Sequence, residues 1–331
     1  MELTLLAEAE LDRVKPLWLA YRAGRLSGSD VAAPLVGAEA SWARRRQLYE
    51  TVLADGGAVV AAHDGEADHG YAAWRPVRMP WPATFDTAPC LADFTSLVVS
   101  EGRADVADRL ATRMEEMAAA LWLRNGIASV NSADTRLISF YRRRGFTPVW
   151  TILARFDASV PTTQDGGSFA ISEVPAHEVD ELRSLCDALH DHHRRVAGHL
   201  APFVAHERSW AVFRPYFLAS AERGLALRAG AGSAPSGMVT ATLLEDAPLV
   251  TDVWAVRGDM VEIEVLAVAE AARGRGLGKA LMRAIDVRLK EAGIRNQIVG
   301  AFAPNHGAVK LYLDLGFKSA VLQLAKFDAG R

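Results

Sequence analysis

The feature that most constrains the fold of this chain is an internal repeat. Residues 140–156 read FYRRRGFTPVWTILARF, and residues 311–327 read LYLDLGFKSAVLQLAKF. Tyr141 and Tyr312 occupy the same place in the two segments, a Gly-Phe pair follows each tyrosine, and both segments end on phenylalanine, always 171 residues apart. Because one offset holds to the last matched residue, the repeat predicts a duplicated domain.

The predicted domain boundary lies in a segment with few apolar residues. Residues 157–168 read DASVPTTQDGGS, which combines Pro, Gly, Ser and Thr and has no apolar period. The chain has 331 residues, enough for two separate cores. We therefore expect a domain over 1–157, a linker over 158–168 and a second domain over 169–331. Strand-like and helix-like segments are mixed in both halves, which predicts an α/β layered fold.

Composition excludes several classes of function. The formal net charge of −3 gives no overall basic field, so no nucleic-acid partner is expected. No apolar run reaches the ~18 residues of a membrane span, and the first residues lack the pattern of a signal peptide, so no membrane partner is expected. Cys90 and Cys186 are isolated, which fits neither a disulfide framework nor a metal site. These features are typical of a cytoplasmic protein.

A glycine-rich turn in the second half predicts a phosphate site. Residues 264–282 read EVLAVAEAARGRGLGKALM, so Gly274, Gly276 and Gly278 lie between an apolar strand and a helix. Such a turn leaves backbone N–H groups exposed at the positive end of the helix dipole, where a pyrophosphate binds well. Side chains would obstruct the ligand, and a positive φ outside glycine costs about 1–2 kcal/mol.

Two common nucleotide-binding motifs do not fit this turn. A P-loop requires Ser or Thr after Gly-Lys, but Gly278 and Lys279 are followed by Ala280, and Arg273 stands where the leading glycine belongs. A dinucleotide fingerprint requires a third glycine that falls here on a lysine or a leucine, depending on where the motif is started. Neither a P-loop nor a dinucleotide-binding domain is predicted.

Two motifs together resemble the GCN5-related N-acetyltransferase (GNAT) superfamily. Residues 273–278 fit the pattern R-x-x-G-x-G, and residues 305–317, NHGAVKLYLDLGF, fit N-x-x-A-x-x-L-Y-x-x-x-G-F at every defined position. Both lie within about 260–327. The resemblance implies two tandem domains, each with a mixed, mostly antiparallel sheet flanked by helices, and it implies acetyl-coenzyme A (acetyl-CoA) as co-substrate.

The resemblance also implies a set of cofactor contacts. The glycine-rich turn would hold the pyrophosphate, the preceding strand would bind the pantetheine arm through its main chain, and Asn305 would contact the arm from the other side. Tyr312 would protonate the departing thiolate, although packing between helix and sheet is its structural alternative. The expected cofactor-binding residues are Leu266, Ala267, Val268, Arg273, Gly274, Arg275, Gly276, Leu277, Gly278, Lys279, Asn305 and Tyr312.

A glutamate pair supplies the candidate general base. Glu262 and Glu264 are two residues apart on a predicted strand, so both should face the same side as Leu266 and Val268. The resemblance implies that one glutamate removes the proton of the acceptor amine. Glu262 is favoured because family bases usually lie well upstream of the pantetheine-binding segment; a solvated edge face is the alternative for either residue.

A histidine-rich segment, residues 189–206, resembles a metal site at first sight. His190, His193 and His199 do not keep the i, i+4 spacing of a helical zinc pair, and no cysteine or glutamate completes a ligand set. No metal is therefore expected. We expect this segment to be the loop between the first two helices of the second half, which in the superfamily borders the acceptor site.

The first half lacks the glycines of the second. After the strand at 96–99, the corresponding turn carries Asp105 and Ala107 where glycine is needed, and Asp134 replaces the counterpart of Asn305. Acidic residues stabilise a helix N-terminus but repel a pyrophosphate. We expect the first half to have no cofactor site and to serve as a packing partner, a wall of the acceptor cleft or a dimer surface.

The leading functional hypothesis is an acetyl-CoA-dependent N-acetyltransferase. The resemblance implies direct transfer, in a ternary complex, to a primary amine of a small molecule. Alternatives are a protein N-terminal or lysine acetyltransferase, a longer acyl donor, and a non-catalytic CoA-binding or scaffold protein. A homodimer is left open.

Overall fold

The computed structural model describes residues 1–26, 35–81, 83–87, 90–156, 169–230, 235–244, 254–256 and 258–327. The predicted linker, 158–168, lies outside the described residues. The first half contains β1 (Glu2–Leu5), α1 (Lys15–Tyr21), α2 (Ala38–Ala54), β2 (Ala58–His63), β3 (Asp68–Arg78), β4 (Cys90–Val99), α3 (Ala104–Ala120), β5 (Gly126–Asn131), α4 (Thr135–Arg143) and β6 (Thr147–Arg155). The second half contains β7 (Ile171–Glu173), α5 (Arg183–Ala197), α6 (His206–Glu222), β8 (Ala226–Ala229), β9 (Gly237–Leu244), β10 (Met260–Val268), α8 (Leu277–Glu291), β11 (Asn296–Phe302), α9 (His306–Asp314) and β12 (Lys318–Lys326).

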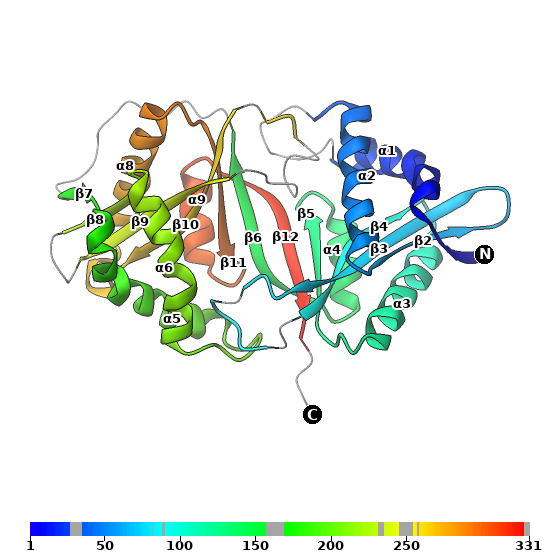
Figure 1. Cartoon of the computed structure of the whole chain (residues 1–331), viewed down its shortest axis with the longest axis horizontal. Helices are drawn as coiled ribbons and strands as arrows, with labels where there is room; N and C mark the ends of the chain where they lie inside the picture. The colour runs from blue at the N-terminus through cyan, green and yellow to red at the C-terminus, as the bar shows by residue number, and fades with distance from the viewer. Residues whose placement is uncertain are drawn as a thin grey trace.

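The strands form one 12-stranded sheet in the order β1-β2-β3-β4-β5-β12-β6-β11-β10-β9-β8-β7 (Figure 1). The pairs β4–β5 and β10–β11 are parallel, and the other neighbouring pairs are antiparallel. The predicted α/β class with mostly antiparallel pairing is therefore confirmed. Two domains suggest two separate sheets, but the two halves of this chain share one continuous sheet.

The internal repeat has the same local geometry in both halves. Helices α4 and α9 each have nine residues, and each is followed at the same distance by a nine-residue strand, β6 or β12. Gly145 and Gly316, which end the two helices, both have φ of 87°. The tyrosine of each helix packs edge-on against the following phenylalanine, with ring centroids 5.2 Å apart in the first half and 5.9 Å in the second.

The last strand of each half is exchanged with the other half. Strand β6 follows α4 in the chain but pairs with β11, whereas β12 follows α9 but pairs with β5, and β6 and β12 pair with each other at the centre of Figure 1. The exchanged strand is anchored by Arg155, whose Nη2 donates to Asp286 Oδ1 at 2.5 Å and to Gln297 Oε1 at 2.9 Å. The two halves are thereby joined, because the last strand of each pairs with a strand of the other.

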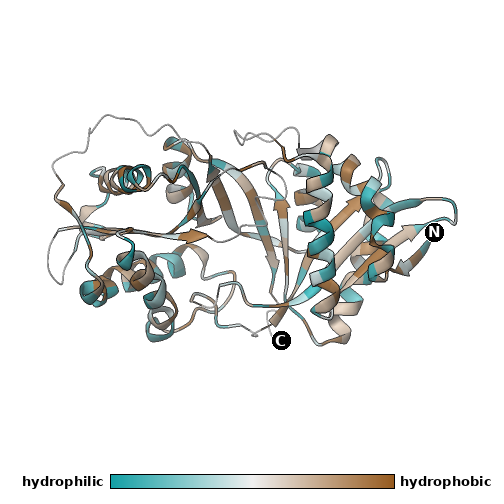
Figure 2. Cartoon of the chain, turned by 45° about the horizontal axis from the view of Figure 1, so that its top comes forward, coloured by the Kyte–Doolittle hydropathy of each residue, from teal (hydrophilic) through white to brown (hydrophobic). Residues whose placement is uncertain are grey.

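Helices cover both faces of the sheet. In the second half, α8 packs on the face with Val261 and Ile263, and α5 and α6 pack on the face with Val265 and Ala267. Figure 2 shows apolar residues concentrated on the strands and hydrophilic residues along the helices. Among the described residues, no helix has the length and apolarity needed to cross a bilayer.

A gap opens in the sheet where the parallel strands separate. Strands β10 and β11 pair over Met260–Ile263 and Asn296–Val299 and then diverge, while β11 stays paired with β6 along its other edge from Gln297 to Phe302. Strands β4 and β5 pair in parallel over two positions only, while the whole of β5 pairs with β12 along its other edge. The sequence motifs of the second half lie around the β10–β11 gap.

Candidate active site

A β-bulge in β10 aims both glutamates into one cavity. Pairing with β9 shifts register between Ile263 and Val265, so Glu264 is the extra residue of the bulge. Glu262 and Glu264 share the α5–α6 face, as expected. The prediction that Leu266 and Val268 lie on this face was wrong, because the bulge reverses the alternation and places both against α8.

The cavity beside the bulge, here named the C-terminal cavity, has a volume of about 470 Å³. It extends from the two glutamates to Tyr312 on α9 and to Leu266 and Asn305 near the β10–β11 gap. Its remaining wall includes residues from both halves of the chain: Pro80, Trp81, Ala83, Thr84, Trp150, Ile152, Leu189, His193, Val212, Phe213, Tyr216, Thr242, Leu244, Gly300, Ala301, Phe302, Ala308 and Gln323.

Burial makes the glutamates weaker acids than glutamate in water. Removal from solvent, followed by the charge of Glu264, raises the pKa of Glu262 to about 8. Removal from solvent also raises the pKa of Glu264, while a hydrogen bond from Thr242 acts in the opposite direction. A carboxylate whose pKa lies near neutral pH can accept and release a proton under physiological conditions, as a general base requires.

Tyr312 lies on α9 and is 5% exposed. Burial raises the pKa of its hydroxyl above the ordinary value, so the hydroxyl stays protonated at neutral pH. Within the part of the chain that the structure describes, this hydroxyl has no hydrogen-bond partner, and the side chain lines the C-terminal cavity. It is therefore available as a proton donor, in addition to packing against Phe317.

The glycine-rich turn between β10 and α8 has the backbone that an anion site requires. Gly274 and Gly276 have φ of 72° and 86°, and apart from their chain neighbours no heavy atom of the described residues lies within 4 Å of where a Cβ would stand. Gly276 is the N-cap of α8, whose first turn leaves N–H groups without helical partners. Gly278 has a different role, because its Cβ position lies 3.4 Å from Leu311 of α9.

Basic side chains surround this turn. Arg273 Nε donates to the carbonyl oxygen of Val268 at 3.1 Å, which links the turn to the end of β10. Arg275 is exposed, and Lys279 lies 3.6 Å from Asp314. The positive φ values, the helix N-terminus and these cations fit the pyrophosphate of acetyl-CoA.

Asn305 has a clear structural role. Its Oδ1 accepts a hydrogen bond from the backbone N–H of Ala308 at 3.3 Å, which makes it the N-cap of α9. It also lines the C-terminal cavity. Asn305 therefore caps α9, and this structural role is compatible with a ligand contact.

The histidines lie mainly on helices, which corrects the expectation that their segment is a loop. His190 and His193 are on α5, because the helix continues to Ala197. His190 is buried, and its Nε2 lies 2.9 Å from the carbonyl oxygen of Val204. His193 lines the cavity, and burial lowers its pKa to about 3. Among the described residues, no group of three or more His, Cys, Asp or Glu could hold a metal ion.

The first half has a shorter turn at the corresponding place. Residues 100–103 connect β4 to α3, whereas residues 269–276 connect β10 to α8. Gly102 has φ of 79°, but Arg103 caps the helix and Asp105 lies in its first turn. This turn has half the length of its counterpart and carries an acidic residue at the helix start, so it does not fit a pyrophosphate.

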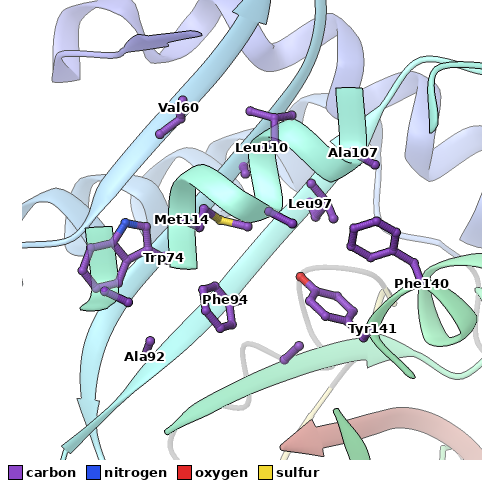
Figure 3. Packing of buried hydrophobic residues seen from close by; sticks show 14 of the residues in the cluster. Val60, Trp74, Ala92, Phe94, Leu97, Ala107, Leu110, Met114, Phe140 and Tyr141 are labelled. Carbon is purple, nitrogen blue, oxygen red and sulfur yellow. The ribbon is translucent and has the colours of Figure 1, made fainter. Parts of the chain in front are cut away.

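Tyr141, the counterpart of Tyr312, lies in a hydrophobic cluster with Phe94, Leu97 and Phe140 (Figure 3). It is 3% exposed, and its hydroxyl has no hydrogen-bond partner among the described residues. The ring of Tyr141 is therefore part of the hydrophobic core of the first half.

Sequence reasoning missed the aromatic wall of the cavity. Trp81 follows β3, and Trp150 is on the exchanged strand β6, so both come from the first half. The ring of Trp150 lies against Gly300, where a Cβ would be 2.2 Å from its Nε1, and it meets Phe302 edge-on at 4.7 Å. No local sequence signal could have identified these residues, since strand exchange brings them to the site.

Comparison with known proteins supports the GNAT assignment. Residues 184–317 match the acetyltransferase (GNAT) family. A GCN5-related N-acetyltransferase from Sphaerobacter thermophilus has a TM-score of 0.58 at 16% identity, over 98% of this chain and 95% of that one. A glucosamine N-acetyltransferase region of a fungal GH3 β-N-acetylglucosaminidase has a TM-score of 0.55 at 14% identity, over 98% of this chain and 38% of that one.

No curated protein matches the sequence. At these identities the solved structures show the fold alone, and they cover nearly the whole chain. The family match covers the second half, where the glycine-rich turn, the bulged strand and the tyrosine helix come together. Residues 184–317 therefore form a domain that matches the GNAT family, and the chain as a whole has the fold of the solved GNAT structures.

Proposed function

We propose that this protein transfers an acetyl group from acetyl-CoA to the primary amine of a small molecule in the C-terminal cavity. The observation that carries the proposal is the composition of this one cavity. It contains two carboxylates whose pKa values are raised, Glu262 and Glu264, and a protonated phenol, Tyr312. The cavity adjoins the strand that leads into the glycine-rich turn.

Two different residues of the cavity carry out the proton transfers at the amine and at the sulfur. Bound acetyl-CoA supplies an activated thioester. Glu262 accepts a proton from the acceptor ammonium, directly or through water, and the freed amine nitrogen attacks the thioester carbonyl carbon. As the carbon–sulfur bond breaks, the hydroxyl of Tyr312 gives its proton to the sulfur, and the second proton that the nitrogen loses on becoming an amide restores the hydroxyl through solvent. The nucleophile is the amine itself, so no covalent enzyme intermediate is required.

Calorimetry tests the cofactor assignment. Acetyl-CoA should bind at one site per chain, and Gly276→Glu should abolish binding because it adds a charged side chain at the helix N-terminus. Gly102→Glu is a matched control, since Gly102 also has a positive φ with open space around it, but lies in the short turn of the first half. Binding at two sites, or full binding by Gly276→Glu, would contradict the proposal.

Turnover separates an enzyme from a CoA-binding scaffold. Free thiol released from acetyl-CoA, with and without a panel of amines, should rise only when an acceptor is present. A protein substrate is tested with peptides that carry a free N-terminus or a lysine, and a longer acyl-CoA tests the donor. Cofactor binding without amine-dependent thiol release would favour the scaffold.

A further inference from the structure

We propose that the acceptor is an aromatic primary amine without an acidic group, selected by a wall that the first half contributes. This inference rests on the proposed function and specifies its substrate class. It follows from the charges of the C-terminal cavity, from its aromatic side chains and from its size.

The charges of the cavity favour a cation and exclude an anion. Glu262 and Glu264 face into it, and none of the described lining residues is lysine or arginine. His193, the basic side chain that remains, stays neutral because burial lowers its pKa to about 3. An ammonium group therefore finds two carboxyl groups whose ionisation its own positive charge favours, whereas a carboxylate or phosphate on the acceptor would be buried without a cationic partner.

Aromatic side chains form the wall around the glutamates. Trp81 and Trp150 come from the first half, and Phe213 and Tyr216 come from α6. Trp81 is 8% exposed and meets Phe85 edge-on at 5.9 Å, so its ring is held in place. Flat aromatic surfaces of this kind bind aromatic rings by edge and offset contacts, and they also attract a nearby ammonium.

The volume of the cavity matches a small molecule. Pockets for drug-sized ligands measure about 300–1,000 Å³, and this cavity has about 470 Å³, part of which lies beside Tyr312 and Leu266 where the thioester would be. The remaining space suits one or two rings and a short alkylamine. Such a ligand would place its nitrogen at the glutamates and its rings against the tryptophans.

Matched pairs of amines test the exclusion of acidic groups. Tryptamine and L-tryptophan differ by one carboxylate, as do phenethylamine and L-phenylalanine. We expect kcat/KM from thiol release to favour the decarboxylated member by about 100-fold, because the extra carboxylate would be buried without a cationic partner. Calorimetry with CoA present should show the same preference in binding. Equal or better use of the amino acids would overturn the inference.

Variants test the role of the wall. Trp150→Ala should remove most of the preference for phenethylamine over ethylamine, while acetyl-CoA affinity stays unchanged. Gly300→Ala should have a similar effect without removing the ring, because the new methyl group occupies the place of the indole. Trp122→Ala, at an 81% exposed position of the first half, is the control. An unchanged preference in both Trp150→Ala and Gly300→Ala would refute the assignment of the wall.

A charge added at the edge of the cavity gives a gain-of-function test. Tyr216 lines the cavity yet is 46% exposed, so Tyr216→Arg can be accommodated, and it should raise the use of L-tryptophan relative to tryptamine by about tenfold.

If acetyl-CoA binds and polar amines react while aromatic amines do not, the inference fails and the proposed function stands. If acetyl-CoA does not bind, both fail.

Discussion

Replacing Glu264 by glutamine should shift the activity of this protein to lower pH. The two glutamates are two residues apart at the bulge of β10, and we take as their separation the roughly 7 Å that two such side chains have in an extended strand. At an effective dielectric constant of about 20, unit charges at this separation repel by about 2.4 kcal/mol, a factor of about 50 in acidity. This repulsion is the largest contribution that the charge of Glu264 can make to the rise in the pKa of Glu262.

The sign of the shift follows from the ionised form of Glu262. Removing the negative charge of Glu264 favours ionised Glu262, so the pKa of Glu262 falls from about 8 and the base is ready at lower pH. Burial raises the pKa of Glu264 as well, so Glu264 is only partly ionised while Glu262 titrates. The acid limb of the pH profile should therefore move by about one pH unit. Burial remains, so the limb does not return to the range of glutamate in water.

The measurement is kcat/KM from thiol release with one amine, from slightly acidic to alkaline pH. Glu264→Gln should keep most of the activity and shift the acid limb, whereas Glu262→Gln should lose about 100-fold or more at every pH. Glu116→Gln, at an exposed position of α3, is the control for the loss of one carboxylate. The reasoning is refuted if Glu264→Gln leaves the acid limb in place, or if Glu262→Gln retains wild-type kcat/KM.

Two further predictions concern the tyrosine and the exchanged strand. Tyr312→Phe should lower kcat by about 100-fold with little change in acetyl-CoA affinity, whereas Tyr141→Phe, the same change in the first half, should leave kcat as it is; equal effects would refute the proton-donor role. Asp286→Ala should lower the free energy of unfolding, measured with urea, by about 3 kcal/mol, because it leaves a buried guanidinium without its carboxylate; Glu116→Ala, at a surface ion pair, should leave the urea midpoint unchanged.

The sequence was sufficient to predict features that depend on neighbouring residues. The glycine-rich turn predicted a backbone conformation that only glycine adopts at low cost, and Gly274 and Gly276 both have positive φ in the structure. The repeat around Tyr141 and Tyr312 predicted a duplicated domain, and both copies contain a nine-residue helix whose tyrosine packs against the following phenylalanine. These features could be predicted because the backbone conformation of a turn and the packing of one helix turn are set within about ten residues.

Features that depend on pairing between distant segments could not be predicted. The bulge at Glu264 arises from register with β9, and a strand pattern read by alternation places Leu266 on the wrong face. Trp150 belongs to the first half in sequence, yet it lines the cavity of the second because β6 pairs with β11. Strand exchange keeps the hydrophobic pattern of β6 unchanged, so the sequence does not distinguish pairing within one half from pairing between halves.

The exchange of strands gives a physical reason why a half that does not fit a pyrophosphate is retained. Without β6, the second half would expose the edge of β11 and lose the wall that carries Trp150, and Asp286 would lose the guanidinium of Arg155. The first half in turn depends on β12 to cover the edge of β5. A first half that binds no cofactor would therefore still cover the edge of β11 and supply the wall that carries Trp150, whereas loss of the whole half would remove both.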